Sequence, residues 1–161
     1  NKKRISLLNT ARGNQYKKMY AEAERSAVTE FKHYKNNPLF IAGLMIYVGE
    51  GDNLDSHLIR IANSKIDVHR IFIKFALEYL GVPREKIRFW VLLYPDLSPK
   101  KCLHTWSKAL RIPLSQFHKY QVIEGRSTKR TLHDGVGNTL IGNRAMKRKL
   151  LKWIDIIKHS L

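Results

Sequence analysis

The stretch PLFIAGLMIYVGEGD, residues 38–52, decides how the rest of the chain is interpreted. Asn37 before it is a good helix N-cap, and Pro38 suits the first helical position, where its missing N–H costs nothing. No charged side chain occurs from Leu39 to Val48, which predicts a helix buried on most of its sides. The run is shorter than the roughly 20 apolar residues that a membrane span needs. This helix is therefore expected to belong to a protein core.

The end of this helix is acidic, whereas the chain as a whole is strongly basic. Gly49 and Gly51 end the helix and hold Glu50 between them. The 161 residues include 30 Lys and Arg against 13 Asp and Glu, a net charge of +17. Such an excess repels itself unless it meets a polyanion, so nucleic acid is the expected partner, with a merely soluble basic protein as the alternative. A carboxylate fixed in this setting suggests a metal site that faces a phosphate backbone.

Composition also excludes several classes of protein. The single cysteine, Cys102, excludes an intramolecular disulfide and a cysteine-cluster zinc site. No signal peptide or transmembrane run occurs, so we expect a cytoplasmic, nucleoid-associated protein with no membrane partner. No glycine-rich phosphate loop or Ser/His/Asp arrangement is present, and no small-molecule substrate is expected.

Apolar periodicity predicts two parts, a basic helical arm over residues 1–36 and an α+β domain over 37–161. The domain should have a four-stranded, mostly antiparallel sheet, with helices on one face and the other face free for DNA. The predicted helices are 38–50, 65–80, 98–111 and 144–159, and the predicted strands are 57–64, 86–94, 117–123 and 136–141.

Two groups of side chains are candidates for DNA contacts. The strands carry residues that can read base edges, since Arg suits guanine and Gln suits adenine; these are Arg60, Arg88, Trp90, Lys119 and Gln121. For each of them a merely solvated sheet face is the alternative. A basic surface of the loop 124–135 and the last helix can contact phosphates, which position a protein without specifying sequence; its members are Arg126, Lys129, Arg130, His133, Arg144 and Lys147.

The buried helix ending in Gly-Glu-Gly, followed by a strand, Asn63-Ser64 and an amphipathic helix, resembles the LAGLIDADG homing-endonuclease family. Aligned backward from Glu50, the motif covers residues 43–51. The apolar helix and the terminal acid match, but the literal string does not. The resemblance implies the LAGLIDADG-like fold over residues 38–161.

One motif in a chain of this size implies a homodimer, because family members with a single motif pair their motif helices across a two-fold axis. Ala42, Met45, Ile46 and Gly49 fall on one stripe at i, i+3, i+4 and i+7, and small residues at its ends allow close approach of two helices. The two Glu50 carboxylates would then meet at the axis and repel each other unless Mg²⁺ and DNA phosphates lay between them. An ordinary core helix in a monomer, with Glu50 as an exposed turn acid, remains the alternative.

The resemblance implies a site-specific DNA endonuclease that makes double-strand cuts with Mg²⁺ or Mn²⁺. Glu50 would hold the metal, with Gly49 and Asp52 as further ligands, and Lys119 and Gln121 would support catalysis. Two other functions stay open: a non-cleaving transcription regulator with a degenerate LAGLIDADG-like domain, and an RNA-binding maturase-type protein.

Overall fold

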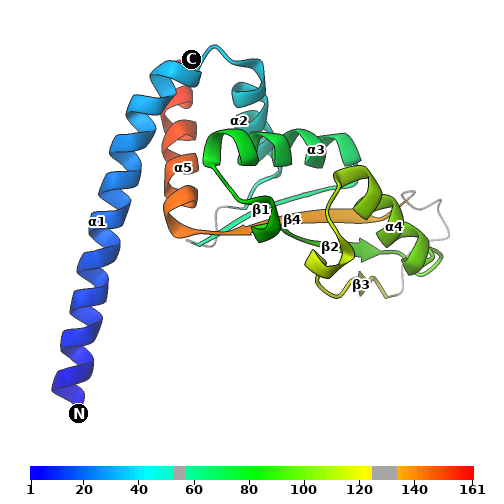
Figure 1. Ribbon diagram of the computed structural model, residues 1–161, viewed down its shortest axis with the longest axis horizontal. Helices are drawn as coiled ribbons and strands as arrows, with labels where there is room; N and C mark the ends of the chain where they lie inside the picture. Colours follow the sequence, from blue (N-terminus) through cyan, green and yellow to red (C-terminus); the bar gives the residue numbers. More distant parts are fainter. Residues whose placement is uncertain (53–56, 125–133) are drawn as a thin grey trace.

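The computed structural model describes residues 1–52, 57–124 and 134–161, and within them the chain forms five α-helices and one four-stranded sheet (Figure 1). The helices are α1 (Lys2–Tyr34), α2 (Pro38–Glu50), α3 (Ile66–Phe75), α4 (Pro99–Leu110) and α5 (Arg144–Lys158). The strands are β1 (Leu58–Asn63), β2 (Arg88–Leu93), β3 (Gln121–Val122) and β4 (Val136–Gly142). This order confirms the predicted α+β class and the predicted succession of elements. No helix among the described residues is long and apolar enough to cross a bilayer.

The sheet is mixed, so the predicted mostly antiparallel character is not confirmed. The strand order is β1-β4-β2-β3, in which β4 is antiparallel to both β1 and β2 while β3 runs parallel to β2. The parallel pair arises because the chain crosses over through α4 between β2 and β3. The predicted strand 117–123 shrinks to two residues, since Phe117 packs its ring on Phe89 with the centroids 5.1 Å apart and makes only an isolated bridge.

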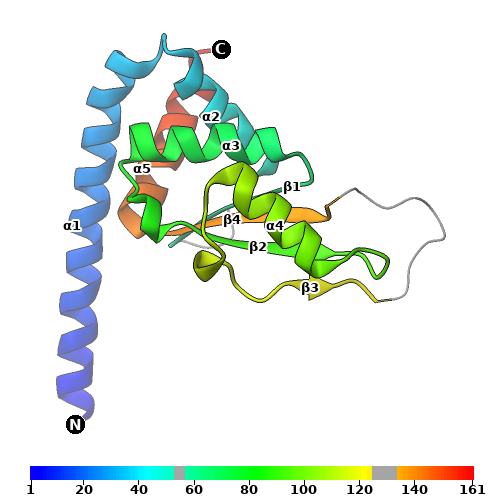
Figure 2. The same ribbon diagram turned by 45° about the vertical axis from the view of Figure 1, so that its right-hand side comes forward.

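Burial alternates along the strands, as expected for a sheet with one covered face. The helices lie on one side of the sheet, and within the described residues no helix covers the other (Figures 1 and 2). Side chains on the helix side are at most 2% exposed: Ile59, Ile61, Phe89, Val91, Leu93, Thr139 and Ile141. Their neighbours along β1 and β2 are half-buried on the other side, which we call the open face.

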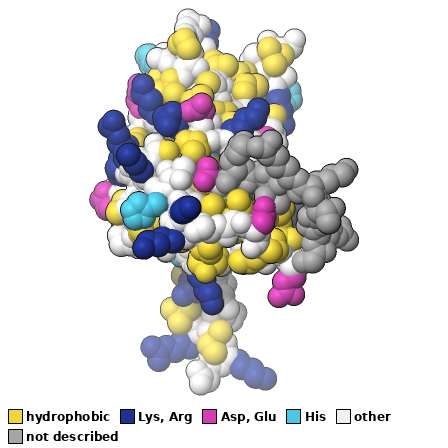
Figure 3. All heavy atoms as spheres, turned by 90° about the vertical axis from the view of Figure 1, so that its right-hand side faces the viewer, with side chains coloured by type: hydrophobic (Ala, Val, Ile, Leu, Met, Phe, Trp, Pro, Cys, Tyr) yellow, Lys and Arg dark blue, Asp and Glu magenta, His cyan; other side chains and the backbone are white. Residues whose placement is uncertain are grey.

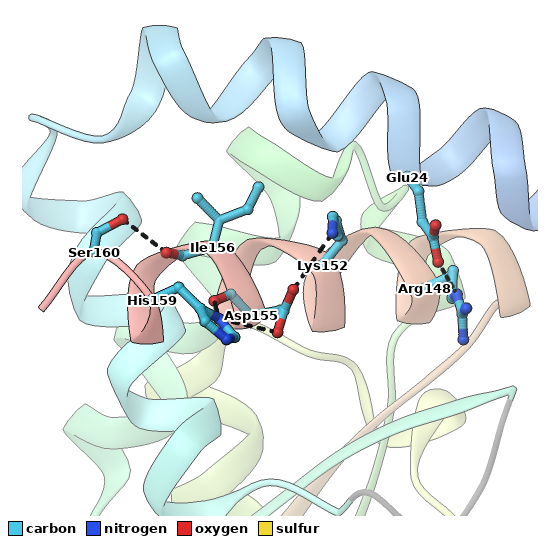
Figure 4. A network of polar contacts seen from close by, with 7 residues as sticks. All are labelled: Glu24, Arg148, Lys152, Asp155, Ile156, His159 and Ser160. Atoms are coloured by element: carbon cyan, nitrogen blue, oxygen red, sulfur yellow. Dashed lines mark hydrogen bonds and ion pairs between the residues drawn. The ribbon is translucent and has the colours of Figure 1, made fainter.

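Helix α1 projects beyond the domain at its N-terminal end, but its second half packs along α5 (Figure 1). Ala27 and Phe31 belong to the same core as the sheet, and the indole of Trp153 donates to the carbonyl of Ala27 at 3.0 Å. The Glu24 and Arg148 side chains form an ion pair at 2.6 Å between the two helices (Figure 4). The second half of the predicted arm therefore packs as part of the domain.

Helix α2 begins as predicted, with the Asn37 side chain accepting from the backbone N–H of Leu39 at 2.9 Å. Its inner face is apolar and buried: Phe40, Gly43, Leu44 and Tyr47. The prediction of burial on most sides is only partly right, because Met45 is 39% and Val48 45% exposed. An apolar strip of α2 thus faces solvent in the single chain.

His69 of α3 is a fully buried titratable side chain beneath the sheet. Its Nε2 lies 3.0 Å from the carbonyl oxygen of Asn63, which can only accept, so Nε2 carries the proton. Its Nδ1 then accepts from the Thr139 hydroxyl at 2.8 Å. Burial lowers the pKa of His69 to about 4, so the ring is neutral at pH 7.

This burial predicts a pH-dependent stability. Between the unfolded pKa near 6.5 and the folded pKa of about 4, the unfolded chain binds more protons, so stability is full above pH 6.5 and falls as the pH drops. Protonation linked to His69 should lower the free energy of unfolding by about 3 kcal/mol between these two pH values. Urea unfolding at pH 7 and pH 4.5 measures it, with His69→Gln expected to flatten the dependence and the exposed His104→Gln to leave it unchanged. Identical pH profiles for all three proteins would contradict the assignment.

Candidate nucleic-acid and metal-binding site

The acidic end of α2 lies against the outer edge of the sheet. Gly51 caps the helix through its N–H to the carbonyl of Tyr47 at 2.9 Å and forms a bridge with Ile61 of β1. The N–H of Asp52 then donates to the carbonyl of Arg60 at 3.1 Å. The chain leaving the helix therefore runs antiparallel to β1, and Glu50 is left exposed as the last helical residue.

Asp52 points toward the open face and meets a basic partner there. Its carboxylate lies 3.3 Å from the Arg60 guanidinium, with the two side chains 16% and 41% exposed. The predicted DNA-reading Arg60 and the predicted ligand Asp52 are thus direct neighbours. At this half-exposed position the pair is of modest strength, so a phosphate or a cation can compete for either partner.

Lys147 was predicted to contact phosphates, and the structure corrects this, because the side chain is only 1% exposed. Its ammonium donates to the hydroxyl of Tyr47 at 2.5 Å, to the carbonyl of Leu58 at 2.9 Å and to the carbonyl of Asp52. Those three acceptors come from α2, from β1 and from the segment between them. Lys147 therefore fixes the acidic end of α2 against the sheet, and it is not a surface cation.

Tyr47 completes this polar cluster from within the apolar helix. Its hydroxyl donates to the carbonyl of Asp52 at 2.5 Å while accepting from Lys147. Burial, reinforced by the negative charge of Asp52, raises the pKa of Tyr47, so the phenol keeps its proton and can donate. Residues 47, 52, 58 and 147 together set the position from which Glu50 projects.

The open face places the two predicted strand arginines in one row. Arg60 of β1 and Arg88 of β2 both pair with Leu140 of β4, so two strand spacings, about 10 Å, separate their backbones. Trp90 lies in the next row, opposite Asn138. Arg88 also donates to the carbonyl of Glu85 at 2.7 Å, which holds its guanidinium near the sheet. The prediction that Arg60, Arg88 and Trp90 share one face is confirmed.

The structure does not bring the predicted catalytic residues together. Gln121 is on β3, whereas Glu50 lies beyond β1, and the strand order puts these at opposite edges of the sheet. Three strand spacings, about 14 Å, separate β1 from β3. Lys119 is exposed in the segment before β3. Within one chain, Lys119 and Gln121 cannot act on the same atom as Glu50. Beside the acidic end lie the partly exposed Arg60 and the buried Lys147.

The remaining predicted contacts divide into two groups. Arg144 is half-buried, with its guanidinium carbon 4.9 Å from the ring centroid of Tyr16, so this side chain joins α5 to α1. The predicted loop contacts lie outside the described residues: Arg126, Lys129, Arg130 and His133.

Carboxylate and carbonyl oxygens are the donors available for a metal at the acidic end. The described part of the chain has no group of three or more His, Cys, Asp or Glu side chains that could hold an ion. Glu50, Asp52 and the carbonyl of Gly49 nevertheless fit Mg²⁺ in kind, because this ion prefers oxygen ligands and commonly uses one or two carboxylates with substrate phosphates. One chain supplies part of a coordination shell, and a second chain or a phosphate would have to supply more.

Sequence patterns contained a signal for the buried lysine that the prediction missed. Lys147 falls three residues before Leu150 and continues the spacing of Ile154 and Ile157, the buried stripe of α5. A charged residue on an apolar stripe predicts a buried hydrogen-bonding role. Tyr47 offered a weaker signal, as the one hydroxyl in the uncharged run 39–48.

Figure 3 views the molecule from the side on which α4 lies. Lys and Arg side chains gather along the left of this view, while acidic side chains occur singly. Further Lys and Arg side chains lie elsewhere in this view, including on the projecting end of α1.

Comparison of the chain with models of known protein families, with curated proteins and with solved structures found no match.

Proposed function

We propose that this protein binds double-stranded DNA through the open face of its sheet and cleaves it, as a homodimer with Mg²⁺ or Mn²⁺, in the manner of single-motif LAGLIDADG endonucleases. The observation that carries the DNA-binding part is the row of Arg60 and Arg88 on a helix-free sheet face, next to Trp90. Two arginines on strands whose backbones are about 10 Å apart can reach the phosphates and base edges of a DNA major groove, which is about 12 Å wide. The net charge of +17 supplies the long-range attraction.

The solvent-facing strip of α2 supports the dimer. Ala42 and Ile46 of the predicted stripe are half-buried, and Ile46 packs against the core. Met45 is 39% exposed and Gly49 has no described atom within 4 Å of the place where a Cβ would stand, so this part of the strip is uncovered. Pairing two α2 helices along it would bury the apolar side chains that a single chain leaves in water. It would also bring two copies of Glu50 and Asp52 toward one axis.

Glu50 is the residue proposed to hold the metal. A carboxylate at the C-terminal end of a helix meets the negative end of the helix dipole, so helix stability does not account for its presence. When bound, Mg²⁺ would supply Lewis-acid stabilisation of the charge that develops on the phosphodiester. Arg60 would bind a neighbouring phosphate oxygen, and the Lys147 cluster would keep the Glu50 backbone in place.

One observation favours the second candidate function, a non-cleaving DNA-binding regulator. Asp52 is ion-paired with Arg60 at 3.3 Å, so Arg60 competes with a metal ion for this carboxylate, while Glu50 is exposed. A site that binds DNA but holds the ion weakly would give binding without cleavage.

A salt titration tests the role of the open face. We expect log K for duplex DNA to fall linearly with log salt, with a slope of about −0.9 for each phosphate neutralised. Arg88→Gln combined with Lys119→Gln should weaken binding about tenfold and reduce the steepness of the slope by about 2. Fluorescence anisotropy with a labelled duplex measures both quantities.

The matched control removes the same charge from the helix layer. Lys74 and Lys108 are exposed on α3 and α4, and their double Gln variant should change the DNA affinity by less than about twofold. If both double variants weaken binding equally, the open face is not the DNA-binding surface.

A further inference from the structure

A cavity of about 830 Å³ opens between α3, α4 and the short 3₁₀ turn η2 (Arg84–Lys86), on the helix layer and away from the open face. Five basic side chains line it and no acidic one does: Arg70, Lys74, Arg84, Lys108 and Arg111. Hollows lined by charge of one sign focus the electrostatic field and concentrate the opposite ion. The proposed DNA-binding surface does not use this cluster.

Most of these cations have no acidic partner within residues 1–52, 57–124 and 134–161. Arg70 pairs with Asp67 at 2.5 Å, but both side chains are more than half exposed, so this ion pair is weak. For Lys74, Lys108 and Arg111 the described residues show no ion pair. Their mutual repulsion is therefore left uncompensated by the protein, and a bound polyanion would relieve it.

The dipole of helix α4 opposes anion binding in the cavity, but its effect is smaller than the attraction of the five cations. The C-terminus of α4 brings the negative end of a helix dipole, roughly half a charge, to the same cavity. Arg84 covers the last carbonyl of that helix, donating to Leu110 at 3.4 Å. Five formal positive charges outweigh the partial negative charge that remains.

The backbone conformation of Arg111 also supports a binding site at this cavity. This residue caps α4 in the left-handed conformation, with φ 55° and ψ 40°, and it is the one non-glycine residue of the described chain with positive φ. Glycine adopts this conformation freely, whereas other residues are strained there. The chain thus has an arginine at a strained position that lines the cavity, and strain of this kind collects at binding sites.

The volume and the lining residues of the cavity indicate the class of ligand. A volume of about 830 Å³ lies within the range of small-molecule sites and is far too small to enclose a duplex. Ile73 and Leu110 also line the cavity, but they are only 3% and 4% exposed, so they offer a ligand little surface and the basic side chains set its chemistry. Arginine forks match phosphate oxygens.

The geometry points to a binding site for a small polyphosphate, either free or carried by a nucleotide, held by Arg70, Lys74, Arg84, Lys108 and Arg111. Its phosphate chain lies among these five cations. This site goes beyond the proposed DNA function and does not depend on it.

Calorimetric titration of the whole chain with inorganic tripolyphosphate, with ATP and with a random duplex tests the site. Wild type should bind tripolyphosphate and ATP saturably, and the ratio of the two affinities distinguishes a free polyphosphate from one carried by a nucleotide. Lys74→Gln combined with Lys108→Gln should weaken both ligands on the order of tenfold and leave duplex binding unchanged. The control, Lys17→Gln with Lys18→Gln on the exposed part of α1, removes the same charge and should leave all three affinities unchanged.

Arg111→Gly supplies a second variant that separates binding from folding. Because glycine relieves the left-handed strain, its melting temperature should equal or exceed that of wild type, while ATP binding weakens several-fold. The proposal is overturned if wild type binds neither tripolyphosphate nor ATP, or if the α1 control weakens binding as much as the cavity variant. It is also overturned if the cavity variant loses affinity only for the duplex, which would make the cavity a second DNA contact.

Discussion

Gly43→Leu should unfold the domain, whereas Gly49→Leu, six residues further along α2, should leave each chain folded. A Cβ at Gly43 would stand 2.1 Å from Cγ of Phe75. That ring is fully buried and cannot retreat, since it packs against Phe40, Phe72 and Tyr79. The cost should exceed about 3 kcal/mol, a large part of the 5–15 kcal/mol that stabilises a typical domain.

At Gly49 an added Cβ would have no described atom within 4 Å, apart from those of its own helix backbone and chain neighbours. Replacing a helical glycine should stabilise the single chain by roughly 0.5–1 kcal/mol. In a dimer packed along α2, however, the leucine would force the helices apart. Circular dichroism melting should therefore show a folded Gly49→Leu variant and an unfolded Gly43→Leu variant. Sedimentation should show a dimer for wild type and a monomer for Gly49→Leu. A monomeric wild type at micromolar concentration, with and without DNA, would refute the dimer.

Glu50→Gln should abolish DNA cleavage while DNA binding stays equal or tightens. The substitution keeps the shape of the side chain and removes the charge that would hold Mg²⁺, and a catalytic metal contributes several kcal/mol, so the rate should fall by a factor on the order of 10³. Losing a carboxylate near the DNA surface lowers repulsion of phosphate. The measurement is cleavage of a high-affinity duplex selected from a random library, with Mg²⁺ and with Mn²⁺.

Two controls make this result interpretable. Glu85→Gln removes the same charge from an exposed acid of the turn before β2 and should cleave as wild type does. The melting temperature of Glu50→Gln should equal or exceed that of wild type, because the lost carboxylate faced the negative end of a helix dipole. A wild type that cleaves nothing with either ion favours the regulator. Full activity in Glu50→Gln would mean that the active site lies elsewhere.

Much of the fold was predictable because the helix-capping residues and the apolar periodicity of the sequence agree with the observed helix ends and buried faces. Asn37 and Pro38 mark the start of α2, and alternation predicts the covered and open faces of β1 and β2. The direction of β3 was not predictable, because it depends on the crossover through α4 and not on the strand's own residues. Phe117 illustrates the limit: its alternation favours a strand, but its ring packs on Phe89 and its backbone makes only an isolated bridge.

The candidate site was predictable only in part, since sequence pattern gives the face of an element but not the order of strands. Arg60 and Arg88 were placed correctly on one face, while Gln121 was grouped with Glu50 although the strand order puts them at opposite edges. Only a weak indication of the cavity between α3 and α4 is present in the sequence, because Arg70 and Lys74 lie four residues apart on one side of their helix. The third side of the cavity is formed by Arg84, and this tertiary contact is not predictable from a local pattern.

The Lys147 cluster has a consequence for the order in which the molecule is completed. The ammonium of Lys147 reaches acceptors that lie 100, 95 and 89 residues earlier in the chain. Such contacts form late in folding, after the chain entropy of a long loop has been lost. A growing polypeptide on the ribosome therefore contains helix α2 and Glu50 long before Lys147 is synthesised and can form these hydrogen bonds. The acidic end acquires its fixed geometry only when the last helix docks, so nascent or C-terminally shortened chains would carry the motif without a formed site.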